Sequence, residues 1–228
     1  MTRAAAGVVL AGGASARMGT AKAAIPWGDG TLLSRAVGAL APAVGRVVVV
    51  RAPGQDLPPL PAGVTVTEDA HAARGPLEGL AAGLAALRPG EDAFVLAVDM
   101  PFAGADLAAA VLAALGPDAD AAVPRADGRT HPLAAAYRAV VAVTARELLA
   151  GGRARMTDLL DAIRVTWIDA AALPGGAGAL ANVNTPEELA AARQAMREYA
   201  TTSPAATPPG GTIASASAPV SEVTAWAP

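Results

Sequence analysis

The chain has 228 residues, of which 53% are hydrophobic but only 3% aromatic, so its core must be built mainly from alanine, valine and leucine. The net charge of −3 argues against the broad basic face that binding to nucleic acid requires. The absence of cysteine excludes disulfides, thiolate metal sites and a cysteine nucleophile.

The sequence carries no signal for a membrane. No stretch reaches the roughly 20 uninterrupted apolar residues that span a bilayer. The apolar run at residues 4–11 superficially resembles a short signal peptide, but it ends in Gly12-Gly13 and leads directly into a loop. We therefore expect a soluble, cytoplasmic protein without a membrane or nucleic-acid partner.

Short apolar runs alternate with longer helical patterns, which is typical of βα units on a mostly parallel sheet. The segment 47–50 consists of four valines and predicts a strand buried on both faces. We predict strands at about residues 7–10, 46–50, 64–67, 93–98, 121–123, 134–137 and 165–168. We predict helices at about residues 32–40, 77–87, 105–115, 140–149 and 186–199. The expected fold is a three-layer, Rossmann-like α/β domain.

The last predicted helix has the clearest start signal. Thr185 supplies a hydroxyl at the N-cap, Pro186 occupies the first helical position, and Glu188 stands three residues after the cap. Beyond residue 200 the composition changes to Thr, Ser, Pro, Ala and Gly, with a single charge. We predict one domain over residues 1–200 and a disordered tail over residues 201–228.

A glycine-rich loop follows the first predicted strand, with the sequence LAGGASARMGTAK at residues 10–22. Glycine lets the backbone approach an oxyanion closely, while Arg17 and Lys22 supply positive charge, so the loop suits a triphosphate. The spacing matches neither a Walker A loop nor the dinucleotide fingerprint. Gly12-Gly13 alone would equally fit a tight turn between strand and helix.

Lysine usage favours the phosphate interpretation. Lys22 is the one lysine among seventeen basic residues, and it stands in this loop. An ammonium is a compact point charge that fits between phosphate oxygens, whereas a guanidinium is larger and forked.

Asp99 follows the apolar strand predicted at residues 93–98. Ligands of open α/β sheets bind beyond the carboxyl ends of the strands, and a carboxylate there can bind Mg²⁺ between protein and phosphate oxygens. A carboxylate that caps the following turn is the alternative. Together with the glycine loop, the position favours magnesium.

The loop resembles the signature of the molybdenum cofactor guanylyltransferases, within the wider nucleotidyltransferase superfamily. The resemblance covers residues 5–197 and rests on five motifs in the same order. These are LAGGASARMGTAK at 10–22, GPLEGL at 75–80, VDMPF at 98–102, HPL at 131–133 and NVNTPEE at 182–188.

The resemblance implies a nucleotide site made of the Leu10, Ala11, Gly12 and Gly13 backbone, Lys22, Asp69 and Asp99. Asp69 would contact the bound nucleotide, and Lys22, Arg17 and Asp99 would act in the reaction, Asp99 by holding Mg²⁺.

The acceptor side is implied to include His131, Asn182 and Asn184. The two asparagines would contact the pterin or phosphate of the acceptor. Asn184 could instead hold the turn before Thr185, and His131 could be structural.

The implied reaction transfers GMP from GTP to molybdopterin and releases pyrophosphate. Leu-Ala-Gly-Gly resembles the guanylyl members, whereas Leu-Ala-Ala-Gly is more typical of cytidylyl members, so Gly12 favours GTP. The alternatives are transfer from CTP to molybdopterin, transfer to a sugar phosphate, and a non-catalytic module that delivers the cofactor. The implied partners are GTP, molybdopterin and proteins of molybdoenzyme maturation, and we expect a monomer.

Overall fold

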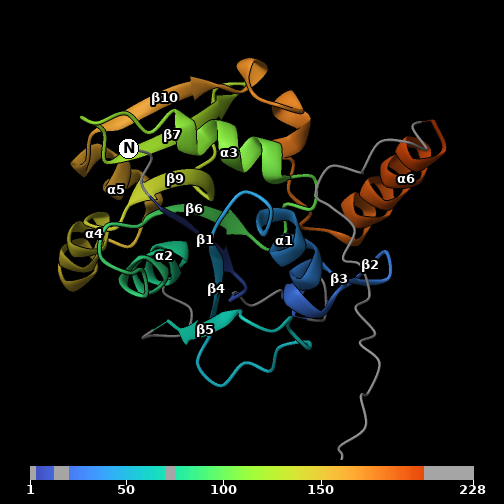
Figure 1. The fold of residues 1–228 in the computed structure, drawn as a ribbon, viewed down its shortest axis with the longest axis horizontal. Coiled ribbons are helices and arrows are strands. Elements are labelled where there is room, and N and C mark those ends of the chain that lie inside the picture. Colours follow the sequence, from blue (N-terminus) through green and yellow to red (C-terminus); the bar gives the residue numbers. More distant parts are fainter. Residues whose placement is uncertain (1–3, 13–20, 70–74, 203–228) are drawn as a thin grey trace, which may run out of the picture.

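The structure is a computed structural model that describes residues 4–12, 21–69 and 75–202. Within these residues the central sheet has eight strands, in the order β10-β7-β9-β6-β1-β4-β5, with β8 paired to β7. Along this order every pair is parallel except the two that involve β9. The predicted three-layer, mostly parallel α/β fold is confirmed (Figure 1).

The strands of this sheet are β1 (Ala5–Leu10), β4 (Arg46–Arg51), β5 (Thr65–Glu68), β6 (Asp92–Ala97), β7 (Ala121–Ala126), β8 (Arg129–Thr130), β9 (Ala134–Arg138) and β10 (Val165–Asp169). The α-helices are α1 (Leu32–Leu40), α2 (Pro76–Ala85), α3 (Ala105–Ala113), α4 (Val141–Ala150), α5 (Met156–Ala162) and α6 (Pro186–Thr202). A small hairpin of β2 (Pro26–Trp27) and β3 (Gly30–Thr31) precedes α1. Three short 3₁₀ helices, at Lys22–Ala24, Ala170–Ala172 and Gly176–Leu180, complete the described elements.

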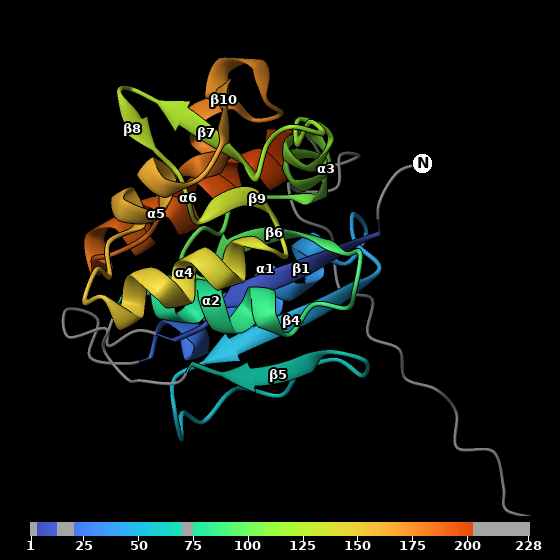
Figure 2. The ribbon, with the colours of Figure 1, turned by 90° about the vertical axis from the view of Figure 1, so that its left-hand side faces the viewer.

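The core lies on both faces of the sheet because successive side chains of a strand point to opposite sides. In β1, Val9 belongs to the core cluster that includes residues of α1, α3 and α6, whereas Val8 and Leu10 belong to the cluster that includes residues of α2, α4 and α5. Figures 1 and 2 show the two helical layers with the sheet between them. Central strands buried on both faces explain why β4 is an uninterrupted run of valines between its two arginines.

Helix α2 packs very closely on the sheet. A Cβ atom added at Gly83 would lie 2.4 Å from Val8 Cγ1 and 3.1 Å from Val50 Cγ2. Glycine at this position therefore lets the helix approach β1 and β4.

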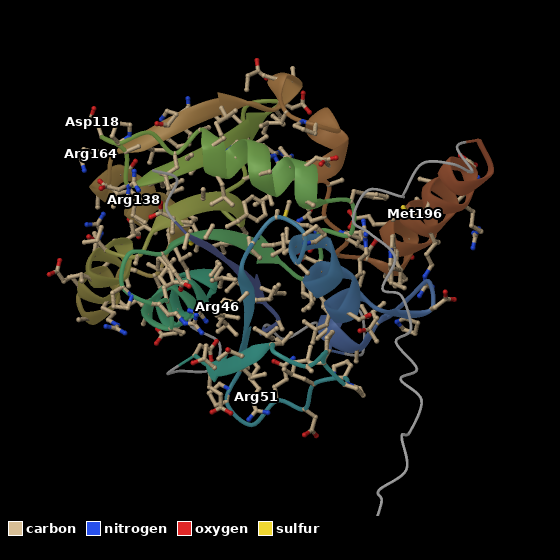
Figure 3. All side chains as sticks on the ribbon, viewed as in Figure 1. Arg46, Arg51, Asp118, Arg138, Arg164 and Met196 are labelled. Atoms are coloured by element: carbon tan, nitrogen blue, oxygen red, sulfur yellow. The ribbon has the colours of Figure 1, made fainter. Side chains whose placement is uncertain are left out.

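Three ion pairs tie strand ends together at the amino edge of the sheet, opposite the edge where ligands of such folds bind. Arg46 pairs with Glu91 at 2.8 Å, Arg138 with Asp92 at 2.9 Å, and Arg164 with Asp120 at 2.9 Å. The hydrogen bonds from Arg46 lower the pKa of Glu91. Figure 3 shows the three arginines along this side of the molecule. These groups serve the fold rather than the site.

The sequence did not predict α5, the β2–β3 hairpin or β8. Helix α5 has seven residues and each of these strands has two, so their side chains show too few repeats for a periodic pattern.

Helix α6 continues to Thr202, two residues beyond the predicted domain boundary, and the remaining tail, residues 203–228, lies outside the described residues. No helix in the described ranges is both long enough and apolar enough to cross a membrane.

Candidate functional site

Several polar residues gather at the carboxyl edge of the sheet, where ligands of open α/β sheets bind. Gly12 follows β1, Asp69 follows β5, and Asp99 lies in the turn after β6. Lys22 begins the 3₁₀ helix that enters the β2–β3 hairpin. Gly13 and Arg17, which were predicted to belong to this site, lie outside the described residues.

The centre of the site is the ammonium group of Lys22. Its Nζ atom donates to Asp99 Oδ2 at 2.6 Å and to Asn184 Oδ1 at 2.7 Å. The side chains of Lys22 and Asp99 are 21% and 16% exposed, so the pair is largely shielded but still open to a ligand. Three predicted residues from distant parts of the chain therefore meet at one point.

Backbone contacts hold the two oxygen-bearing residues independently of the lysine. The Val183 amide donates to the Asp99 carbonyl at 2.8 Å, which joins the segment before α6 to the turn after β6. The Asn184 amide donates to Glu188 Oε2 at 2.6 Å, and the Glu188 amide donates to Thr185 Oγ1 at 3.2 Å. The predicted N-cap at Thr185 is thus present, and the Asn184 side chain remains available to Lys22.

The sequence analysis missed Arg35, which supports the same turn from α1. Its Nε donates to the Pro101 carbonyl at 2.9 Å, and its Nη2 is buried without a hydrogen-bond partner among the described residues. Burial lowers the pKa of Arg35 to about 10. The sequence did contain a signal for this residue, because Arg35 is a charged side chain between the apolar pairs at 32–33 and 36–37 of the helix, which are buried.

The loops after β1, β4 and β5 meet beside Gly12. A Cβ atom added at Gly12 would lie 3.2 Å from the Ala52 nitrogen and 3.5 Å from Asp69 Oδ2. Gln55, also missed from the sequence, joins two of these loops, because its Nε2 donates to the Ala11 carbonyl and its Oε1 accepts from the Ala52 amide. The predicted residues Leu10, Ala11, Gly12 and Asp69 therefore lie together.

His131 lies in the connection between β7 and β9. Its amide donates to the Pro124 carbonyl at 2.9 Å, and the Ala97 amide donates to the carbonyl of Leu133 at 2.8 Å, which places this segment beside the end of β6. Burial, assisted by the charge of Arg129, lowers the pKa of His131 and favours the neutral imidazole.

Asn182 differs from Asn184 although only one residue separates them. Asn182 is exposed, and its side chain makes no hydrogen bond within the part of the chain that the structure describes. The structure brings Asn184, but not Asn182, to the lysine.

Asp99 and Asn184 have the donor chemistry of a magnesium site. Mg²⁺ takes oxygen ligands and is commonly bound by one or two protein groups together with substrate phosphates and water. Because Asp99 Oδ2 and Asn184 Oδ1 both contact one ammonium, they lie within reach of a single cation. No group of three or more His, Cys, Asp or Glu side chains forms a metal site among the described residues. The residues fit a cation whose other ligands come from phosphate and water.

The mostly parallel sheet thus presents a lysine, a carboxylate and an amide together at its carboxyl edge. The chain belongs to the MobA-like NTP transferase domain family, whose sequence profile matches residues 7–164. The family predicted from the sequence motifs is thereby confirmed.

Curated relatives extend the match over most of the chain. A probable molybdenum cofactor guanylyltransferase of Mycobacterium tuberculosis H37Rv is 40% identical over 200 residues, covering 84% of this chain and 94% of the relative. A protein of the same name from Mycobacterium marinum is 41% identical over 194 residues, covering 82% of this chain and 92% of the relative.

Solved structures support the fold. The molybdopterin-guanine dinucleotide biosynthesis protein A of Archaeoglobus fulgidus has a TM-score of 0.68 at 21% identity, covering 85% of this chain and 99% of that chain. The 2-C-methyl-D-erythritol 4-phosphate cytidylyltransferase of Thermus thermophilus has a TM-score of 0.63 at 21% identity, covering 86% of this chain and 100% of that chain.

Proposed function

We propose that this nucleotidyltransferase transfers GMP from GTP to molybdopterin, which yields the guanine dinucleotide form of the cofactor and pyrophosphate. The observation that carries the proposal is the convergence of Lys22, Asp99 and Asn184 at the carboxyl edge of the sheet. The choice of substrates is supported by the relatives at 40% identity that are named probable molybdenum cofactor guanylyltransferases.

In the proposed reaction an oxygen of the terminal phosphate of the acceptor attacks the α-phosphorus of GTP. A new P–O bond forms, the bond between the α-phosphorus and the bridging oxygen breaks, and pyrophosphate leaves with that electron pair. The attacking phosphate is already an anion at neutral pH, so no general base is required. Positioning and neutralisation of charge are then the main tasks of the protein.

Lys22 is suited to neutralise charge that develops on the triphosphate, and Arg17 is proposed to assist it. Asp99 and Asn184 would hold Mg²⁺ as the cofactor. When bound, this ion would neutralise the phosphate oxygens and orient the triphosphate. Contacts of the Val183 and Asn184 amides hold the backbone of Asp99 and Asn184, which supports a common place for the two side chains at the site.

The proposal of guanine specificity rests on the resemblance of Leu-Ala-Gly-Gly to the guanylyl members. A Cβ atom at position 12 would press on the backbone of Ala52 and lie near the carboxylate of Asp69. Glycine at this position therefore lets the three loops approach one another at the proposed nucleotide site. On the acceptor side, His131 and Asn182 are proposed to contact molybdopterin.

Pyrophosphate release from purified protein tests this function. GTP, CTP, ATP and UTP are supplied in turn with Mg²⁺, with and without molybdopterin. The proposal predicts release that requires molybdopterin and is fastest with GTP. Preferential release from CTP would contradict guanylyl transfer, and no release from any nucleotide would contradict the reaction itself.

A further inference from the structure

The ammonium of Lys22 holds both oxygens that would bind the divalent cation. It contacts Asp99 Oδ2 at 2.6 Å and Asn184 Oδ1 at 2.7 Å, which are short, charge-assisted distances. Only 21% of the lysine side chain and 16% of the Asp99 side chain are exposed, so solvent screens the pair weakly. The ammonium of Lys22 therefore already neutralises the carboxylate of Asp99, which a divalent cation would need as a ligand.

A divalent cation and this ammonium would compete for the same two oxygens. Each would have to contact Asp99 Oδ2 at close range, and two cations at that separation repel each other in a shielded site. Binding of the ion to these atoms is therefore opposed while the ammonium holds them. A triphosphate offers the ammonium an alternative set of negatively charged oxygens.

The backbone that carries both oxygens would stay in place after the lysine leaves. The Asp99 carbonyl accepts from the Val183 amide, the Met100 amide donates to the Ala97 carbonyl, and the Asn184 amide donates to Glu188. None of these contacts involves Lys22. Removal of the lysine charge should therefore free both oxygens for a cation without collapsing the turn.

We infer that Lys22 competes with the divalent cation for Asp99 and Asn184, which makes tight cation binding dependent on the nucleotide. This inference rests on the proposed function, because it assigns the cation and the triphosphate to the same site. Its consequence is that the lysine charge acts in opposite directions on the two ligands. It weakens binding of the cation alone and strengthens binding of the triphosphate alone.

Binding of Mn²⁺ to the full chain tests the inference without any turnover. Free Mn²⁺ is measured by electron paramagnetic resonance in the absence of nucleotide, for wild type, Lys22→Met and Lys22→Gln. We expect both neutral variants to bind Mn²⁺ about tenfold more tightly than wild type, which corresponds to about 1.4 kcal/mol. In a second measurement without metal, a fluorescent GTP analogue should bind these variants about tenfold more weakly.

Three controls separate the local effect from other causes. Lys22→Arg keeps the charge and should show no gain in Mn²⁺ affinity. Arg164→Met makes the same change in net charge at the ion pair with Asp120, and it should leave Mn²⁺ affinity unchanged. Asp99→Asn in the Lys22→Met background should abolish the gain. Circular dichroism establishes that each variant is folded.

Unchanged or weaker Mn²⁺ binding by both neutral variants would overturn the inference, as would a gain that survives Asp99→Asn. An equal gain in Arg164→Met would also overturn it, since net charge would then explain the effect. Failure of the proposed function is seen separately, as a lack of pyrophosphate release by wild type. The Mn²⁺ measurement is independent of that result.

Discussion

Replacement of Asn184 by alanine tests whether its Oδ1 atom, which contacts Lys22 here and is proposed to bind the divalent cation, matters for nucleotidyl transfer. The substitution removes a hydrogen bond of 2.7 Å from a charged donor in a partly buried site. A hydrogen bond to a charged group contributes about 1.5–3 kcal/mol. If the cation takes the place of the ammonium on this oxygen in the transition state, with a contribution of the same size, kcat/KM for GTP falls by about 10- to 150-fold.

Asn182→Ala is the matched control for this substitution. It removes the same amide group two positions earlier, from a side chain that is exposed and makes no hydrogen bond within the described ranges. We expect kcat/KM for GTP to stay within about threefold of wild type, since surface changes are usually worth no more than about 0.5 kcal/mol. The KM for the acceptor can still rise if Asn182 contacts molybdopterin.

The assay is steady-state pyrophosphate release at saturating acceptor, with thermal unfolding of both variants as a check on folding. Because the Asn184 backbone amide, not its side chain, binds Glu188, alanine should leave the start of α6 intact. Equal losses of kcat/KM for GTP in the two variants would refute the argument. So would wild-type activity in Asn184→Ala.

Three further predictions follow from the same structure. Lys22→Arg should lower kcat at least about tenfold, because a forked guanidinium does not fit the place of a compact ammonium; full activity would contradict this role. Gly12→Ala should lower kcat/KM about tenfold with GTP and less with CTP, since the added methyl would lie 3.2 Å from the Ala52 nitrogen; equal losses would remove Gly12 from base selection. Arg46→Met should cost about 2 kcal/mol in denaturant unfolding at neutral pH, because Glu91 stays buried without its charged partner and keeps, among the described residues, only the hydrogen bond from the Arg88 amide. Because Arg46 lowers the pKa of Glu91, its stabilisation is present above the ordinary glutamate pKa and is lost as pH falls through the lowered one, so the difference between the proteins should shrink in acid.

The sequence predicted the elements whose patterns are long or strongly apolar. The valines of β4 and the helix Leu32–Leu40 are recognisable because burial imposes their composition and spacing. Helix α5 was missed because seven residues give only two turns. The β2–β3 hairpin was missed because its two-residue strands have no measurable alternation.

The residues of the site also differ in how far the sequence could predict them. Local motifs indicated Lys22, Asp99 and Asn184 one by one, but their meeting depends on packing between segments that are 77 and 162 residues apart. Asn184 reaches Lys22 and Asn182 does not, because the backbone just before α6 directs the two side chains differently. The motif NVNTPEE alone does not predict this backbone conformation. Arg35 was missed for a similar reason, since its partner is a backbone carbonyl 66 residues away.

Transfer of radioactive phosphorus tests the central claim most directly. GTP labelled at the α-phosphorus is incubated with the protein, Mg²⁺ and molybdopterin, and a parallel reaction uses GTP labelled at the γ-phosphorus. Nucleotidyl transfer predicts that the α-label moves to the molybdopterin product, whose mass rises by one GMP unit less water, while the γ-label appears in pyrophosphate. Appearance of the γ-label on molybdopterin, or no label on it from either nucleotide, would contradict the proposed transfer of GMP.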